Sequence, residues 1–309
     1  MLRAERSAGM PIIVENINHI YSKGQPDESY ALRDVSFSIE DGEFVGVIGH
    51  TGSGKSTLIQ HLNGLLRPDS GRIIIDGYEI TAKDAVLRDI RRKVGLVFQY
   101  PEYQLFEETV AKDVAFGPKN MGLGEEETDQ RIREALRLVN LDYEEFASRS
   151  PFELSGGQKR RVAIAGVLAM QPDILILDEP TAGLDPKAHT EILDMVCKIK
   201  EIRKTTILLV SHNMDDIARL CDKVLVMDHG RLILSGSPRE VFAKAGLLKE
   251  IGLGLPEASE LIEQMRSLGA KIEENVLFPQ EAADAIERYF NADAPMEKRA
   301  GADGRETAE

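Results

Sequence analysis

The feature that most constrains this chain is a glycine-rich segment, Gly49–Thr57, with the sequence Gly-His-Thr-Gly-Ser-Gly-Lys-Ser-Thr. It fits the phosphate-loop pattern G-x-x-x-x-G-K-[ST], which binds phosphate where a strand ends and a helix begins. The apolar run Phe44–Ile48 before it indicates a buried strand, and Lys55–Leu65 after it has the pattern of a helix. The segment therefore predicts an α/β fold and a binding site for a nucleoside triphosphate. The alternative, a glycine-rich structural turn, is disfavoured by the strand and the helix.

Each residue type in this loop has a physical role. Glycines let backbone N–H groups approach phosphates without interference from a Cβ, and the helix N-terminus contributes about half a positive charge. Lys55 is expected to reach the terminal phosphates, and the Ser56 hydroxyl to ligate Mg²⁺. The nucleotide-binding residues predicted here are Gly49, His50, Thr51, Gly52, Ser53, Gly54, Lys55, Ser56 and Thr57.

Short apolar runs alternate with helical patterns along most of the chain, which predicts an α/β sheet with buried parallel strands. The expected strands are Ile12–Asn16, Phe44–Ile48, Arg72–Ile75, Val94–Phe98, Ile174–Leu177, Ile207–Val210 and Val224–Met227. The expected helices are Lys55–Leu65, Glu126–Val139, Gly157–Ala169, Pro186–Ile202 and Met214–Leu220. Asp228-His229-Gly230, between two apolar runs, indicates a hairpin turn.

The pattern changes at two places. Residues from about 102 to 162 are helical and charged, which predicts a helical insertion into the α/β core. Residues 236–290 are expected to form a small helical C-terminal segment, and 291–309 a disordered tail. Residues 1–10 form a short extension, so Met1 and Met10 are both possible starts.

Composition excludes several classes of protein. The net charge of −14 argues against nucleic acid as a partner, because phosphate backbones require a basic surface. No apolar run approaches the roughly 18–20 residues that span a bilayer. We expect no signal peptide, because Arg3 and Arg6 are not followed by an apolar stretch. Cys197 and Cys221 lack metal-ligand spacing, so we expect reduced structural thiols.

A second chemical feature is the pair Asp178-Glu179, which follows the apolar run Ile174–Leu177. An aspartate at a strand end can hold Mg²⁺. The adjacent Glu179 is the natural general base for a water that attacks the terminal phosphate. Such a pair could also simply face solvent, but a phosphate loop in the same chain makes the catalytic interpretation the stronger one.

A third feature is Leu154-Ser155-Gly156-Gly157-Gln158, which precedes an amphipathic helix. A serine and two glycines at a helix start form another anion site, built from backbone donors and the helix dipole. Taken alone, the segment would be interpreted as an ordinary N-cap.

Together these features resemble the nucleotide-binding subunits of ABC transporters over residues 11–235. Leu154–Gln158 resembles the family's signature motif, and Ala182–Asp185 resembles its D-loop. Gln99 resembles the Q-loop glutamine, His212 the switch histidine and Tyr21 the aromatic residue that stacks on adenine.

Longer segments are similar to the ATPases of energy-coupling factor (ECF) transporters, which power uptake of vitamins and of cobalt or nickel ions. They are Gly49–Lys55 continuing to Gln60–Leu65, Phe98–Phe106, Phe116–Asn120 and Leu154–Arg161. The His-Thr pair in the loop is most similar to the second of the two paralogous ATPase subunits.

The resemblance implies a P-loop NTPase core of ABC ATPase type, with a helical subdomain insertion, an N-terminal β subdomain and a small C-terminal extension. ATP would lie between two head-to-tail subunits, expected to be paralogues held together in part by the C-terminal segment. This chain's own ATP and Mg²⁺ would be held by Tyr21, the phosphate loop, Gln99 and Asp178. Glu179 would activate water and His212 would hold the terminal phosphate.

Ser155, Gly156, Gly157, Gln158 and Asp185 would serve the partner's ATP. The resemblance also implies an integral membrane T subunit and a substrate-binding S subunit, and a peripheral location on the cytoplasmic face of the cell membrane. Tyr100–Phe106 and Arg88–Lys93 are candidates for the T-subunit docking surface, although ordinary packing explains them equally well. His50, His19, His61, His189 and His229 are expected to be surface or packing residues rather than metal ligands.

Other functions remain as alternatives. The chain could serve another class of ABC importer. A soluble ABC-type ATPase of DNA repair is less consistent with the sequence, because the long coiled coil of those proteins is missing between Lys55 and Ser155. A nucleotide sensor without hydrolysis is disfavoured because Glu179 and His212 are both present.

Overall fold

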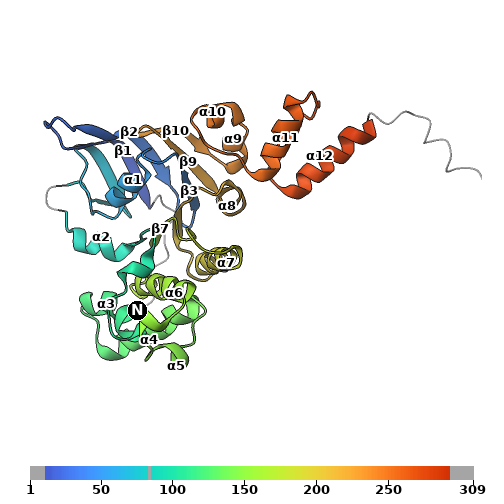
Figure 1. Cartoon of the computed structure of the whole chain (residues 1–309). Coiled ribbons are helices and arrows are strands. Elements are labelled where there is room, and N and C mark those ends of the chain that lie inside the picture. The colour runs from blue at the N-terminus through green and yellow to red at the C-terminus, as the bar shows by residue number, and fades with distance from the viewer. Residues whose placement is uncertain (1–10, 83–84, 293–309) are drawn as a thin grey trace, which may run out of the picture. The chain divides into compact units, whose positions relative to one another are not determined.

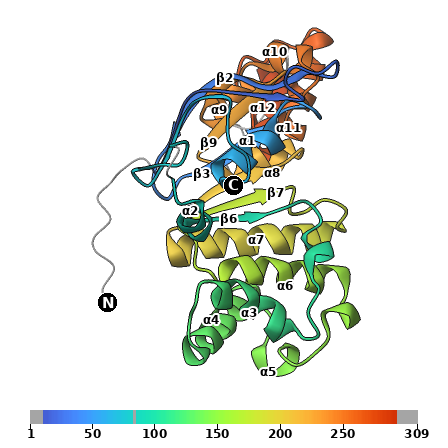
Figure 2. The same cartoon turned by 90° about the vertical axis from the view of Figure 1, so that its left-hand side faces the viewer.

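The structure is a computed structural model that describes residues 11–82 and 85–292. It divides into two compact units, the first ending at Val241 and the second beginning at Phe242. Figures 1 and 2 show the ribbon from two directions. The predicted extension 1–10 lies outside the described residues, as does the predicted tail apart from its first two positions.

A six-stranded sheet forms the centre of the first unit, with the strand order β10-β9-β3-β8-β7-β6. Its strands from β9 to β6 pair in parallel, and β10 pairs antiparallel with β9. The bounds are β3 Phe44–Ile48, β6 Val94–Val97, β7 Ile174–Asp178, β8 Thr206–Val210, β9 Lys223–Asp228 and β10 Arg231–Gly236. Every residue of β3, β7 and β8 is buried. The parallel α/β sheet predicted from the apolar runs is confirmed.

The turn between β9 and β10 contains two residues in the left-handed region, His229 with φ +44° and Gly230 with φ +76°. Asp228 and Arg231 pair across it, so the turn is the expected tight hairpin. The backbone N–H of Gly230 donates to the carbonyl oxygen of Ser53 at 3.0 Å. The hairpin turn therefore lies directly against the phosphate loop.

A four-stranded antiparallel sheet has the order β2-β1-β4-β5, with bounds β1 Ile12–Tyr21, β2 Ser29–Ile39, β4 Ser70–Ile75 and β5 Tyr78–Glu79. The predicted strand Ile12–Asn16 was too short, because β1 continues through register shifts beyond Asn16, whose φ is +49°. The sequence missed β2, whose buried residues Leu32, Val35 and Ile39 do not alternate with exposed ones. Irregular pairing hides the period of two on which strand prediction depends.

Helix α1, Lys55–Leu62, shares one apolar core with both sheets through Leu58, Ile59 and Leu62. It ends three residues earlier than predicted, because the chain turns at Gly64, which has a φ of +70°. Figure 2 shows α6 and α7 on the opposite side of β6 and β7 from α1. The phosphate loop is therefore anchored at both of its ends in packed structure.

Helices without strands occupy the chain between β6 and β7. They are α3 Val110–Asn120, α4 Glu125–Leu138, α5 Tyr143–Phe146 and α6 Gly156–Leu168, with the 3₁₀ helices η1 Pro101–Gln104 and η2 Pro151–Glu153. Helix α2, Leu87–Lys93, precedes β6, while α7, Pro186–Arg203, and α8, Met214–Leu220, follow β7 and β8. This corresponds to the helical insertion expected from the sequence.

The chain after β10 consists of helices α9 Pro238–Phe242, α10 Ala245–Glu250, α11 Glu257–Ser267 and α12 Pro279–Ala292. In the second unit, α11 and α12 pack around a small core that includes Ile262, Ile272 and Ala285. None of the helices in the described part of the chain has the length and apolar character needed to span a membrane.

Candidate functional site

The phosphate loop leaves the end of β3 and closes onto the first turn of α1. Gly52 and Gly54 have φ values of +82° and +102°, a region that favours glycine. A Cβ at Gly54 would also lie 2.5 Å from the carbonyl oxygen of Ala31, so this position requires glycine for two reasons. The loop is thus held in a tight curve that leads into a helix N-terminus, an arrangement suited to phosphate.

Lys55, the first residue of α1, is buried, with 6% of its surface exposed. Its ammonium donates to the carbonyl oxygens of Gly49 at 2.6 Å and His50 at 3.0 Å. Burial lowers the pKa of Lys55, while the carboxylates of Glu179 and Asp178 act in the opposite direction. The lysine is therefore held over the loop by neutral oxygens, which an anionic phosphate could replace.

Ser56 and Asp178 form the second part of the site. The Ser56 hydroxyl lies 3.5 Å from Oδ2 of Asp178, which is the last residue of β7. Burial, and then the charge of Glu179, raise the pKa of Asp178 above its usual range. A buried carboxylate beside a hydroxyl has the oxygen donors that Mg²⁺ prefers, and a cation there would compensate the cost of burial.

Glu179 lies at the centre of the third part. Its backbone is in the left-handed region, with φ +48°, and its N–H donates to the carbonyl oxygen of Val210 at 3.0 Å. One carboxylate oxygen accepts from Nε2 of Gln99 at 2.8 Å, and the other lies 2.8 Å from Nε2 of His212. The three side chains follow the adjacent strands β6, β7 and β8, whose carboxyl ends bring them together.

Tyr21 lies at the end of β1, and its hydroxyl is 3.2 Å from Oγ1 of Thr57 in α1. About 41% of the residue is exposed, while His19 packs against the ring edge-on at 4.7 Å. The contact with Thr57 fixes the position of an accessible aromatic ring beside the first turn of α1.

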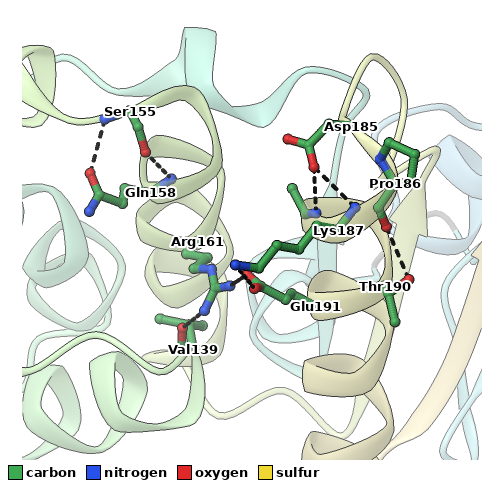
Figure 3. A network of polar contacts seen from close by, with 10 residues as sticks. Val139, Ser155, Gln158, Arg161, Asp185, Pro186, Lys187, Thr190 and Glu191 are labelled. Carbon is green, nitrogen blue, oxygen red and sulfur yellow. Dashed lines mark hydrogen bonds and ion pairs between the residues drawn. The ribbon is translucent and has the colours of Figure 1, made fainter.

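The predicted signature residues lie elsewhere. Ser155 caps α6 in a capping box, accepting from the N–H of Gln158 at 3.4 Å while Gln158 accepts from the N–H of Ser155 at 3.0 Å. Asp185 caps α7 and accepts from the N–H groups of Lys187 and Ala188, each at 3.0 Å. Figure 3 shows both helix starts, which line a common hollow of about 620 Å³.

The structure thus separates the predicted residues into two groups. One contains Tyr21, the phosphate loop, Gln99, Glu179 and His212, together with the Ser56–Asp178 pair described above. The other is the hollow beside Gly156 and Gly157, where the space next to the backbone is open. Among the described residues, those that line the hollow include none from the phosphate loop.

Sequence reasoning assigned no role to Arg160, which is 1% exposed. Its Nε and Nη2 donate to the two carboxylate oxygens of Glu102 at 3.0 and 2.7 Å. Its Nη1 donates to the carbonyl oxygens of Pro180 at 3.1 Å and Ala182 at 2.8 Å. One buried guanidinium therefore joins the segment after Gln99 to the segment after Glu179 and to the signature helix.

Helical spacing could have identified Arg160 as a buried residue. It lies four and eight residues before Ile164 and Leu168, both of which are buried on the same face of α6. A basic residue in an apolar stripe must be paired, because an unpaired buried charge is costly. The sequence could not show which acidic residue is its partner, since Glu102 lies on a different segment.

The fold and the site geometry define an ATP-binding cassette (ABC) ATPase. A family model described as ABC transporter matches residues 32–182. A solved structure of cbiO1 from Clostridium perfringens, part of the ABC transporter complex cbiONQ, superposes with a TM-score of 0.70 at 41% identity. The superposition covers 82% of this chain and 99% of that one. The ATP-binding cassette MJ0796, solved as a dimer bound to ADP and Pi, has a TM-score of 0.65 at 32% identity, covering 74% of this chain and 98% of its own.

Curated relatives define the family more closely. The energy-coupling factor transporter ATP-binding protein EcfA2 of Caldanaerobacter subterraneus subsp. tengcongensis is 59% identical over 281 residues, which cover 91% of this chain and 98% of the relative. EcfA2 of Clostridioides difficile is 57% identical over 278 residues, which cover 90% of this chain and 96% of that relative. The chain belongs to the family of energy-coupling factor transporter ATP-binding proteins. It binds ATP and is an ATPase coupled to transport, as the resemblance in its motifs indicated.

Proposed function

We propose that this chain binds ATP with Mg²⁺ in a site shared with a second ATPase subunit, and that hydrolysis there powers uptake of a vitamin or transition-metal ion. The convergence of Gln99, Glu179 and His212 carries this proposal. These side chains follow the adjacent ends of β6, β7 and β8, and the charge of Glu179 acts on Lys55 in the phosphate loop.

In the proposed mechanism Lys55 binds the terminal phosphates, and Tyr21 stacks on the adenine. Ser56, Asp178 and Gln99 would hold Mg²⁺, which neutralises phosphate charge when bound. Support comes from the Ser56–Asp178 contact of 3.5 Å and from the cost of burying Asp178 without a cation.

Glu179 is the proposed general base. Gln99 and His212 direct its two oxygens, each through a contact of 2.8 Å, so the carboxylate is positioned to accept a proton from an attacking water. His212 is 47% exposed at this point, which leaves its ring accessible to a terminal phosphate.

The second subunit, expected to be a paralogue, would supply the other half of each site. Ser155, Gly156, Gly157, Gln158 and Asp185 surround a hollow without this chain's own phosphate loop, which supports their use on the partner's ATP. The dimeric cassette MJ0796 is a precedent for such pairing. We assign residues 11–235 to the ATPase domain and 236–290 to a segment that helps to hold the pair together.

The membrane partners are proposed to be a T subunit and an S subunit, with this chain peripheral on the cytoplasmic face. A groove of about 700 Å³ beside α2 and α3 suits the docking of a T-subunit segment. It is lined by Arg88 and Arg92 and by the exposed rings of Phe106 and Phe116, which pack edge to face at 5.1 Å.

The central test is Glu179→Gln, measured by equilibrium ATP binding and by phosphate release. Binding should be retained, and turnover should fall by roughly 10²–10⁴-fold because the general base is lost. Glu144→Gln is the matched control, since that carboxylate is 78% exposed on the helical insertion, and it should keep full turnover. Wild-type turnover in Glu179→Gln would remove Glu179 from the mechanism.

A second test addresses the shared site. In the purified ATPase pair, Ser155→Arg should block the hollow and stop hydrolysis at the partner's phosphate loop, while this chain still binds ATP. If this variant instead lost ATP binding at its own phosphate loop, the head-to-tail arrangement would be wrong. A pull-down from membranes should recover the second ATPase and a small integral membrane protein.

A further inference from the structure

Two side chains of the β9–β10 hairpin, Asp228 and His229, converge on the side chain of His50 in the phosphate loop. Nε2 of His50 lies 2.9 Å from Oδ1 of Asp228, and Nδ1 of His229 lies 2.7 Å from the same oxygen. The two imidazole rings are 5.0 Å apart, and the three potential ligand atoms all lie within 4.8 Å of one another. The sequence offered no reason to pair these residues, since 178 positions separate His50 from Asp228.

The orientation of His50 is fixed by its other ring nitrogen. Nδ1 lies 2.7 Å from the carbonyl oxygen of Thr51, and a carbonyl can only accept, so Nδ1 carries the proton. In the neutral ring, the lone pair of Nε2 then points at the carboxylate of Asp228. Two electron-rich atoms at 2.9 Å require a cation between them, either a proton or a metal ion.

We propose that His50, Asp228 and His229 bind one divalent transition-metal ion, of the class of Zn²⁺, Co²⁺ and Ni²⁺. Imidazole nitrogen suits these ions, whereas Mg²⁺ prefers oxygen ligands. The Thr51 carbonyl holds His50 as outer-shell acceptors hold metal-bound histidines. The carboxylate of Asp228 lowers the cost of placing a cation there, and solvent would complete the coordination.

The distances are compatible with this assignment. Ligand atoms around a tetrahedral zinc ion lie about 3.3 Å apart, given bond lengths of about 2.0–2.1 Å. The observed separations of 2.9 and 2.7 Å must therefore widen by roughly half an ångström to admit the ion. His229 can move away from Asp228, because its side chain is 82% exposed at the tip of the hairpin. The distance between His50 and Asp228 must widen through those two side chains, which are 31% and 20% exposed.

The ion would join two segments that already contact each other. Gly230 donates to Ser53 in the loop, and its own carbonyl accepts from the N–H of Arg33 at 2.8 Å. The backbone oxygen of His50 accepts from Lys55, so an ion on the His50 ring would brace the residue that holds the lysine. This site is distinct from the Mg²⁺ site proposed at the Ser56–Asp178 pair.

Metal binding can be measured without nucleotide, partner or hydrolysis, so the result is independent of the proposed function. Calorimetric titration of the full, tag-free chain with Zn²⁺ should give a stoichiometry of one bound ion per chain. Titration with Co²⁺ should give the same stoichiometry. A large excess of Mg²⁺ should not compete. Zn²⁺ should also raise the thermal unfolding midpoint, because a ligand bound to the folded state stabilises it.

Two variants and one control localise the ion. His229→Asn, which tolerates the left-handed backbone at φ +44°, and Asp228→Asn should each weaken Zn²⁺ binding by at least roughly tenfold. His189→Asn removes another imidazole, one that lies 2.8 Å from Asp216, and should bind Zn²⁺ as the wild type does. Absence of stoichiometric Zn²⁺ binding to the wild type, or equal affinity in all four proteins, would overturn the proposal and leave a proton as the bridging cation.

Discussion

The buried pair Arg160–Glu102 gives the sharpest test of the packing argument. In Glu102→Ala the guanidinium loses both charge-assisted hydrogen bonds, at 3.0 and 2.7 Å, and keeps only its two carbonyl partners. Because the Arg160 side chain is only 2% exposed, water cannot replace the lost carboxylate without local opening. We therefore expect a large loss of stability from one substitution.

The magnitude follows from the burial of the two partners. Removing one member of a buried ion pair costs about 3–5 kcal/mol, because the remaining charge is uncompensated. The Glu102 side chain is 16% exposed, so we expect the lower end, about 3 kcal/mol. The control is Glu15→Ala, which breaks the ion pair between Glu15 and Arg72, whose side chains are 43% and 49% exposed respectively. This substitution should cost about 0–1 kcal/mol of unfolding free energy.

The assay is urea unfolding of the full chain, followed by far-UV circular dichroism and by tyrosine fluorescence, since the chain has no tryptophan. The difference between Glu102→Ala and Glu15→Ala in the free energy of unfolding is the relevant quantity. A difference below about 1 kcal/mol would refute the view that a buried, uncompensated Arg160 controls the effect.

The pH dependence provides an independent check. Burial alone would raise the pKa of Glu102, but its hydrogen bonds and charge interaction with Arg160 outweigh burial and lower it. A carboxyl with a lowered folded-state pKa stabilises the protein above its unfolded pKa of about 4.3, and this contribution is lost as the pH falls through the folded value. The loss of unfolding free energy in Glu102→Ala relative to the wild type should therefore have its full value at pH 7 and shrink below about pH 4.

Three further predictions concern single positions. Gly54→Ala should abolish ATP binding in an equilibrium assay, because its Cβ would meet the carbonyl oxygen of Ala31 at 2.5 Å and φ is +102°; normal affinity would contradict the close packing of the loop. A thiol reagent should modify Cys197 before Cys221, since burial raises the pKa of both thiols but encloses Cys221 almost completely; mass spectrometry of labelled peptides checks this, and faster labelling of Cys221 would contradict it. Asp185→Ala should lower stability by about 1–2 kcal/mol through loss of the α7 cap, measured by thermal unfolding; an unchanged midpoint would count against the cap.

The phosphate loop was the part of the site that the sequence determined most fully. Its residues are contiguous, and the strand before it and the helix after it are local patterns, so no distant contact was needed to predict them. The same holds for the buried parallel strands, which appear as continuous apolar runs. The pair Asp178-Glu179 was predicted from its place after an apolar run, and family resemblance added Gln99 and His212 by their order along the chain, but neither showed which side chains touch.

The tertiary structure decided which side chains meet. Gln99 and Glu179 are 80 residues apart and touch because β6 and β7 are neighbours in the sheet. Arg160 is basic by sequence, and its burial depends on the segments that pack over α6. The phosphate loop was a complete motif in the sequence, but only the packing of the hairpin turn against it placed His229 beside His50. Local periodicity encodes backbone conformation, whereas the surroundings of a side chain depend on long-range strand order and loop packing.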